Sequence, residues 1–273
     1  ILNNLSNALR LNGDLDSAIE FSRKAILQRP NYSDALHNLG ICFLEKEEFK
    51  RAIYYFNKAL TNKKDNAALF FSLGNAMKET DELELAIENY NEAISLQPNF
   101  PEALNNLGKV YLLKENHKTA MNYFKEALEY NPNLLEALNN LGDLYKYYGD
   151  IRSAIDCYKK IISSNPKEST FLNKLGASIK EQGDLIGSIN FYKKALINNP
   201  NSPELLSGIG TSLAAIGDID SAINSYKRAI ILDPIESISF YNLGNTFNNL
   251  GKLKEAEISY QKAIEIKSDY YDA

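Results

Sequence analysis

The seven residues EALNNLG occur twice in the chain, at 102–108 and at 136–142, so the copies are 34 positions apart. Steps of 34 forward from Gly40 reach a glycine six more times, and one step back reaches Ser6. A fixed period of this length is typical of repeat proteins, whose units bury their apolar faces against their neighbours. Since eight periods account for almost all 273 residues, the sequence leaves little room for another domain.

Each period contains the apolar pattern of two helices. Within 101–134, Leu104 and Leu107 lie at helical spacing in the first half, and Ala120 and Phe124 do so in the second half. The period therefore predicts a helical hairpin rather than a strand.

The breaks between helices follow from the turn residues. We expect one break near 115–116, at a position that is glycine in the later repeats (Gly149, for example), because glycine adopts the left-handed conformation that ends a helix. A second break is expected at Pro132, which cannot continue the helix before it. Gly108 and Ala120 are small, and they predict a close approach of the two helices.

The residues that recur every 34 positions resemble the tetratricopeptide repeat, and they are represented by Leu107, Gly108, Tyr111, Ala120, Phe124, Ala127 and Pro132. This resemblance implies an all-α protein, an α-α superhelix (solenoid) of about eight antiparallel helix pairs, whose concave surface receives a peptide. We expect a single array over 1–273. Its repeats are predicted at 1–32 (partial), 33–66, 67–100, 101–134, 135–168, 169–202, 203–236 and 237–270, with the start of a further repeat at 271–273.

Composition narrows the classes of partner. With 35 acidic and 30 basic residues the net charge is −5, which argues against a general nucleic-acid groove or an anionic membrane surface. No apolar run approaches the ~20 residues of a membrane span. Cys42 and Cys157 lie at different phases of the repeat, so we expect free thiols. Together with the absence of a secretory leader in the sequence shown, this predicts a cytoplasmic protein.

The sequence contains no motif that predicts chemistry. Phosphate-binding loops, HExxH and CxxC are absent, and neither His37 nor His117 has neighbours at metal-ligand spacing. We therefore expect no catalysis, cofactor or metal in this segment. His37 lies either on the concave face or in solvent, and the second placement is the one we predict.

Asparagine is frequent at the phases that face the predicted concave surface. Two residues before the repeating glycine or its equivalent stand Asn4, Asn38, Asn106, Asn140 and Asn242; one turn later stand Asn7, Asn75 and Asn245; one residue before the first set stand Asn3, Asn105, Asn139 and Asn173. A row of amides can bond an extended main chain without reading its side chains. Asparagine at these phases is also common in such repeats generally, so a purely structural role stays open. Phe71 and Tyr241 either form apolar pockets for a ligand or pack against their neighbours.

The asparagine row resembles the superhelix of O-linked N-acetylglucosamine transferases, in which groove asparagines hold substrate polypeptide. By contrast, the lysine-containing clamp of chaperone-binding repeats is missing. Three hypotheses follow. The chain is a non-catalytic module that binds an extended polypeptide; or it is the substrate-presenting arm of a larger glycosyl-, sulfo- or methyltransferase with its catalytic domain outside this sequence; or it is a structural part that associates end to end through uncapped terminal repeats.

Overall fold

The computed structural model describes residues 1–63 and 65–267, and within them every regular element is an α-helix. Sixteen helices form eight consecutive pairs there, which confirms the all-α prediction. The predicted start of a further repeat at 271–273 lies outside the described residues.

The chain divides into two compact units, Ile1–Asn140 (unit 1) and Leu141–Ala273 (unit 2). That the whole chain is one array stays a prediction. Unit 1 contains α1 (Leu2–Leu11), α2 (Leu15–Gln28), α3 (Ser33–Glu45), α4 (Phe49–Asn62), α5 (Ala67–Glu79), α6 (Leu83–Leu96), α7 (Pro101–Leu113) and α8 (His117–Tyr130). Helix α9 (Leu135–Tyr147) contributes residues to both units. Unit 2 continues with α10 (Ile151–Ser164), α11 (Ser169–Glu181), α12 (Leu185–Asn198), α13 (Pro203–Ala215), α14 (Ile219–Leu232), α15 (Ser237–Asn249) and α16 (Leu253–Ile266).

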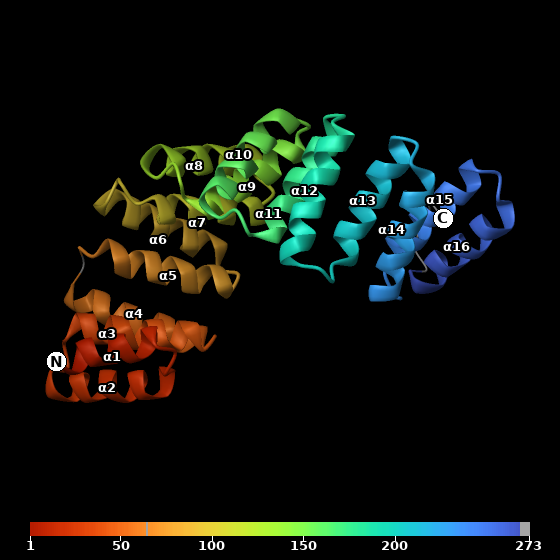
Figure 1. Ribbon diagram of the computed structural model, residues 1–273. Helices are drawn as coiled ribbons and strands as arrows, with labels where there is room; N and C mark the ends of the chain where they lie inside the picture. The colour runs from red at the N-terminus through yellow and green to blue at the C-terminus, as the bar shows by residue number, and fades with distance from the viewer. Residues whose placement is uncertain (64, 268–273) are drawn as a thin grey trace. The chain divides into compact units, whose positions relative to one another are not determined.

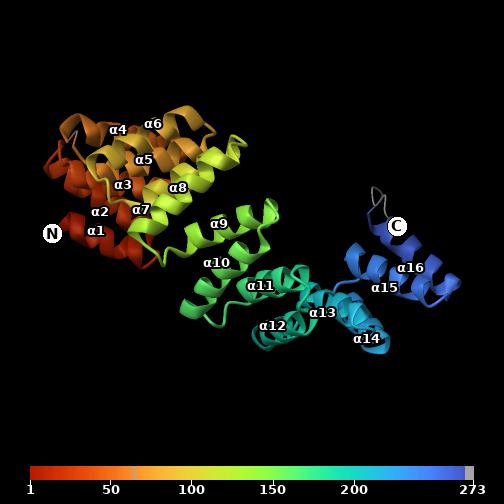
Figure 2. The same ribbon diagram turned by 90° about the horizontal axis from the view of Figure 1, so that it is seen from above.

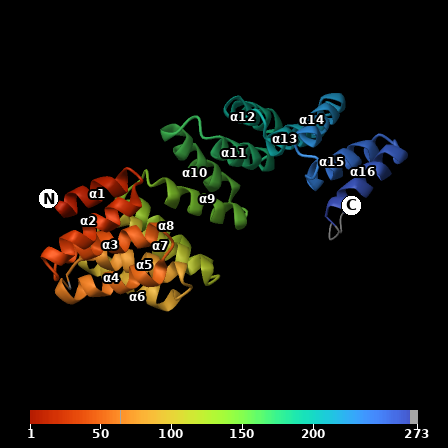
Figure 3. The same cartoon turned by 90° about the horizontal axis from the view of Figure 1, so that it is seen from below.

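Within each unit the pairs stack in chain order. In unit 1 the helices α1, α3 and α5 each pack against their own second helix and also against the next first helix, as α3 does with α4 and α5 (Figures 1 and 2). Unit 2 repeats this arrangement from α11 to α16 (Figure 3). The stacking follows from the apolar stripes, because one hairpin cannot bury its apolar face alone.

The turn inside each pair has the same backbone conformation. One residue per turn has a positive φ, and these residues are Gly13, Glu47, Asp81, Glu115, Gly149, Gly183, Gly217 and Gly251. The predicted glycine turns are thereby confirmed. A side chain in the left-handed region costs roughly 1–2 kcal/mol, so the three acidic residues carry local strain that the glycines avoid.

Five second helices, α2, α8, α10, α12 and α14, begin with a side-chain cap. Asp14 Oδ1 accepts a hydrogen bond from the Ser17 backbone N–H at 3.1 Å, and Asp150 does the same for Ser153. The bonds to Ser17 lower the pKa of Asp14. Such caps satisfy amide groups that have no partner inside the helix.

An aromatic ring of the second helix lies across each repeating glycine. A Cβ placed on Gly108 would be 2.6 Å from the nearest atom of the Phe124 ring, and one placed on Gly40 would be 2.4 Å from Phe56. Both rings are fully buried. The close approach predicted at Gly108 is thus a contact between a helix backbone and a ring.

The first pair replaces this contact with two hydroxyl groups. Ser6 stands at the glycine position and Ser22 at the ring position, their Oγ atoms are 2.7 Å apart, and Ser6 also donates to the Ala18 carbonyl. Both serines are fully buried. The larger residue on one helix is therefore matched by a smaller one on the other.

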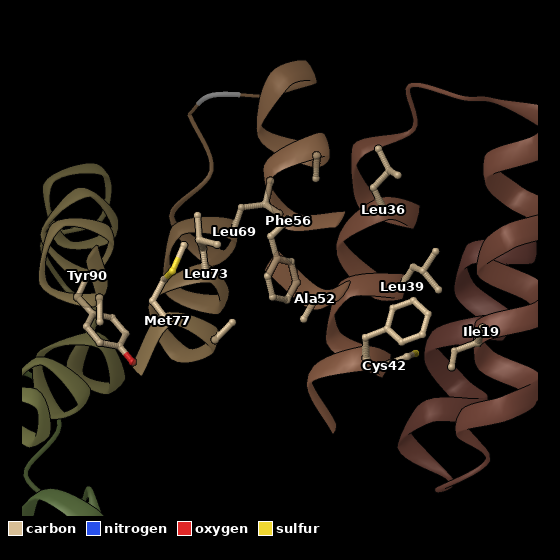
Figure 4. Packing of buried hydrophobic residues seen from close by; sticks show 14 of the residues in the cluster. Ile19, Leu36, Leu39, Cys42, Ala52, Phe56, Leu69, Leu73, Met77 and Tyr90 are labelled. Carbon is tan, nitrogen blue, oxygen red and sulfur yellow. The ribbon is translucent and has the colours of Figure 1, made fainter. Parts of the chain in front are cut away.

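The core of unit 1 is a cluster of buried residues contributed by successive pairs. It runs from Ala18 of α2 to Val110 of α7, and Figure 4 shows Phe56, Leu69 and Leu73 within it. Burial of this kind contributes about 25 cal/mol per Å² of apolar surface removed from water. The interior shared by neighbouring pairs is what holds the first helices side by side.

Candidate functional site

The predicted asparagines bond one another between neighbouring first helices. Asn38 Nδ2 donates to Asn3 Oδ1 at 2.8 Å, and Asn106 Nδ2 donates to Asn75 Oδ1 at 2.8 Å. Asn140 Nδ2 donates to Asn105 at 3.1 Å. The amides are therefore part of the contact between repeats as well as part of the surface.

These bonds fall into two sequence separations, 35 and 31 residues. The first joins His37 to Ser72 at 2.8 Å as well, and the second joins Lys174 to Asp143 at 2.7 Å. Both separations follow from the 34-residue period. A separation of 35 means that the partner lies one residue before the equivalent position of the preceding repeat, and a separation of 31 means that it lies about one helical turn after that position. Sequence reasoning did not predict Ser72, Asp143 or Lys174 in this role, although comparison of those two phases could have found them.

Four amides in unit 1 form a connected network. Asn75 Oδ1 accepts from the Tyr90 hydroxyl at 2.7 Å as well as from Asn106, and Asn105 Nδ2 donates to Asn106 at 3.4 Å. Burial raises the pKa of Tyr90, so its hydroxyl remains a donor. Asn105 is only 4% exposed. Asn105 holds Asn106 and Asn140 in place, and these two side chains are themselves partly exposed.

Unit 2 keeps the geometry with other residues. Asn242 Nδ2 donates to Ser207 Oγ at 3.4 Å, and the Tyr260 hydroxyl donates to Asn245 at 2.7 Å. Asp143 stands at the position of Asn75 and accepts from Tyr158 at 2.6 Å. Burial, followed by this hydrogen bond, raises the pKa of Tyr158.

The remaining predicted amides are more scattered. Asn4 is exposed, Asn7 accepts a hydrogen bond from Arg10 at 3.0 Å, and Asn139 and Asn173 are partly buried. These four amides widen the polar surface of the first helices.

The two aromatic candidates pack against neighbouring rings. The Phe71 ring centroid is 4.9 Å from that of Phe100 and 6.0 Å from that of Tyr90. Tyr241 lies 6.0 Å from Tyr260. These contacts agree with the interpretation that Phe71 and Tyr241 pack against their neighbours, and both side chains are partly buried.

The prediction that His37 is in solvent was wrong. Its ring is half-buried, lies 5.6 Å from the Phe56 ring and is hydrogen-bonded to Ser72. Burial lowers the pKa of His37 to about 4, and the nearby Asp34 carboxylate opposes this effect in part. The imidazole is therefore neutral near pH 7.

Both cysteines are free, as predicted. Both are also buried, and burial raises the pKa of Cys42 and Cys157 to about 11. In the part of the chain that the structure describes, no group of three or more His, Cys, Asp or Glu side chains could hold a metal ion. No described helix is long and apolar enough to cross a bilayer.

Comparison with known families gives a consistent result along the chain. Models described as tetratricopeptide repeat match residues 1–65, 101–134, 135–168 and 237–270, and one described as TPR repeat matches 79–115. Together these matches cover more than half of the sequence. The chain belongs to the tetratricopeptide repeat (TPR) family.

Solved structures share the TPR fold. A crystal structure of MamA has 25% identity and a TM-score of 0.53, and the match covers 60% of this chain and 96% of that one. PilF of Pseudomonas aeruginosa has 23% identity and a TM-score of 0.67, covering 75% and 93%. A tetratricopeptide repeat protein from Parabacteroides merdae has 22% identity and a TM-score of 0.58, covering 90% and 98%. A search of curated proteins gave no match. The fold is thus that of a protein-interaction scaffold.

Proposed function

We propose that this TPR protein binds an extended polypeptide across the amide surface of unit 1, which consists of Asn38, Asn75, Asn106 and Asn140. The observation that supports the proposal most directly is that these side chains, on four successive first helices, are held in place by bonds between repeats. Ordered amides lose less rotamer entropy when a ligand binds.

The hydrogen-bonding capacity of the amides favours a main-chain ligand. A primary amide has two N–H donors and one oxygen with two lone pairs. Asn106 and Asn140 each use one N–H to bond an asparagine of the preceding first helix, so each has a second N–H for a ligand. The Asn75 oxygen already accepts two bonds, which leaves its amino group as the part to be offered. Every amide of the surface therefore keeps at least one N–H donor, which suits the C=O groups of an extended chain.

The expected affinity is low. Each amide-to-main-chain bond contributes a net ~0.5–1.5 kcal/mol, and four of them contribute several kcal/mol. Ordering a flexible peptide costs about as much. A linear peptide should therefore bind with a Kd on the order of micromolar or weaker and with little sequence preference.

The test is a fluorescence titration of labelled peptides of scrambled sequence. The double variant Asn106→Ala/Asn140→Ala is expected to weaken binding roughly tenfold, since it removes two donors worth together about 1–3 kcal/mol. The matched control is Asn105→Ala, which removes the buried anchor of Asn140 but no surface amide, and it should weaken binding less. Equal binding by the double variant and the unmodified protein, with unchanged circular dichroism, would rule out the amides as the ligand-binding groups.

A further inference from the structure

Unit 1 has an open cavity at its second helices α2 and α4, and none of the residues that line it belongs to the amide surface. Its volume is about 330 Å³, and it lies between α2 and α4. The residues that line it include Arg23 and Leu27 of α2, the buried Leu39 of α3, and Tyr54, Tyr55 and Lys58 of α4. A cavity of this size accommodates one large side chain of a partner.

Two apolar side chains at this cavity are unusually exposed. Leu27 is 81% exposed and Tyr54 is 59% exposed. The other repeats show what these positions normally hold. In place of Tyr54 they have Glu20, Glu88, Asn122, Asp156, Asn190, Asn224 and Ile258. The array therefore puts a polar residue at this solvent-facing position in six of the other seven repeats, and folding does not require an aromatic ring there.

The wall of the cavity is fixed by ring contacts. The Tyr54 ring lies edge-on to Tyr55, with centroids 5.1 Å apart, and Tyr55 stacks on Phe43 at 5.4 Å. Phe43 is buried in the core of the unit. Aromatic side chains held this way make low-entropy contacts, which is why tyrosine is enriched among the residues that dominate binding energies.

The charges at the rim have one sign. Arg23 and Lys58 approach the cavity from the two helices, and no carboxylate is among the described residues that line it. Cationic groups beside an exposed apolar patch complement a ligand that combines apolar and acidic side chains.

We propose that the cavity between α2 and α4 binds a partner polypeptide that inserts one large apolar side chain against Leu27 and Tyr54 and places acidic neighbours beside Arg23 and Lys58. This docking site is separate from the amide surface. It is selective for the sequence of the ligand, because a cavity and two charged groups interact with side chains rather than with the main chain.

Unit 2 offers a matched comparison. Ile231 and Ile258 occupy the positions of Leu27 and Tyr54, and they are 76% and 60% exposed. There, however, Ser259 stands in place of Tyr55, and Lys262, in place of Lys58, is paired with Glu265 at 2.5 Å. This site keeps the exposed aliphatic groups but has no aromatic wall and has a neutralised cation.

The experiment is a fluorescence polarisation titration with a short peptide that has a central leucine between two pairs of glutamates. Companion peptides replace the leucine by alanine or the glutamates by lysines. Tyr54→Asn should weaken binding of the first peptide at least fivefold. Arg23→Gln/Lys58→Gln should weaken it similarly and reduce its salt dependence. Ile258→Asn should change it less than twofold. Asparagine is native at this repeat position, so Tyr54→Asn should fold, and circular dichroism checks this.

Four results would overturn the proposal. They are no saturable binding of the glutamate-leucine peptide, equal binding of the lysine peptide, equal weakening by Ile258→Asn, and a self-association of the protein that Tyr54→Asn abolishes, since that would make a second copy the occupant. Asn106→Ala/Asn140→Ala should leave this titration unchanged. Failure at the amide surface is thereby distinguishable from failure here.

Discussion

The contact between glycine and ring makes a sharp prediction for Gly108→Ala. Helix α7 approaches α8 so closely that the new Cβ would lie 2.6 Å from Cε1, 2.9 Å from Cδ1 and 3.1 Å from Cζ of Phe124. Carbon atoms in favourable contact are about 3.5–4.0 Å apart. The Phe124 ring is fully buried, so it can move only by displacing other core residues.

The magnitude follows from two opposing effects. Overpacking a core by one methyl group costs about 1–3 kcal/mol, and the buried ring argues for the upper end. Alanine is the better helix former by about 1 kcal/mol, which offsets part of that cost. We therefore expect Gly108→Ala to lower the free energy of unfolding by about 2 kcal/mol.

The same substitution at Gly187 should act in the opposite direction. Gly187 is also helical, and its new Cβ would lie 2.1 Å from Asp184 Oδ2, but this atom ends an exposed side chain that can shift. The same position holds serine in three other repeats with the same aspartate cap, at Ser17, Ser153 and Ser221, so a Cβ is compatible with the cap. Gly187→Ala should therefore stabilise the protein by about 0.5–1 kcal/mol.

Urea denaturation followed by circular dichroism measures both variants, and amide hydrogen exchange in α7 and α8 localises the effect, because a repeat array need not unfold in one step. In the background Phe124→Leu the cost of Gly108→Ala should fall by at least about 1 kcal/mol. Strictly additive costs in the double variant would refute the contact as the cause.

Three further predictions concern single sites. Glu115→Gly should stabilise the protein by about 0.5–1 kcal/mol in thermal unfolding, because it relieves a φ of 57°; an unchanged melting temperature would argue against strain in that turn. Asn75→Ala should cost about 1–3 kcal/mol in urea denaturation, because the buried Tyr90 hydroxyl loses its acceptor, and Tyr90→Phe in the same background should recover part of the loss. Burial lowers the pKa of His37 from an unfolded value of about 6.5 to about 4, so the stability due to its neutral form is complete above about pH 6.5 and is lost as the pH falls toward 4; His37→Gln should flatten unfolding curves measured over that interval, and an unaltered slope would contradict the assignment.

The fold followed from the sequence because its information is repeated eight times. A single weak apolar stripe is ambiguous, but the same stripe at every 34th position is not, and the glycines at 149, 183, 217 and 251 placed the turns correctly. The turns at Glu47 and Asp81 show the limit of this reasoning. Their conformation could be assigned only by analogy with the other repeats, since glutamate rarely adopts it and aspartate does so only occasionally.

The candidate site was less accessible to sequence reasoning. The helical phase identified the asparagines, but not that Asn105 would be buried or that Asn75 would bond Tyr90. These outcomes depend on how far one helix is displaced along its neighbour, which a periodic pattern does not state. His37 was misplaced for the same reason: its phase allowed two environments, and the neighbouring Ser72 decided between them.

The two fixed separations of the polar bonds also bear on how such a chain changes length. Because each bond joins a residue to its counterpart one repeat away, the loss of one whole period would bring Asn75 and Asn140 to the spacing that now joins Asn75 and Asn106. A new junction would then form between side chains already suited to each other. Gain or loss of an entire period should consequently be tolerated far better than a change of one or two residues, which would put every such pair at that junction out of register.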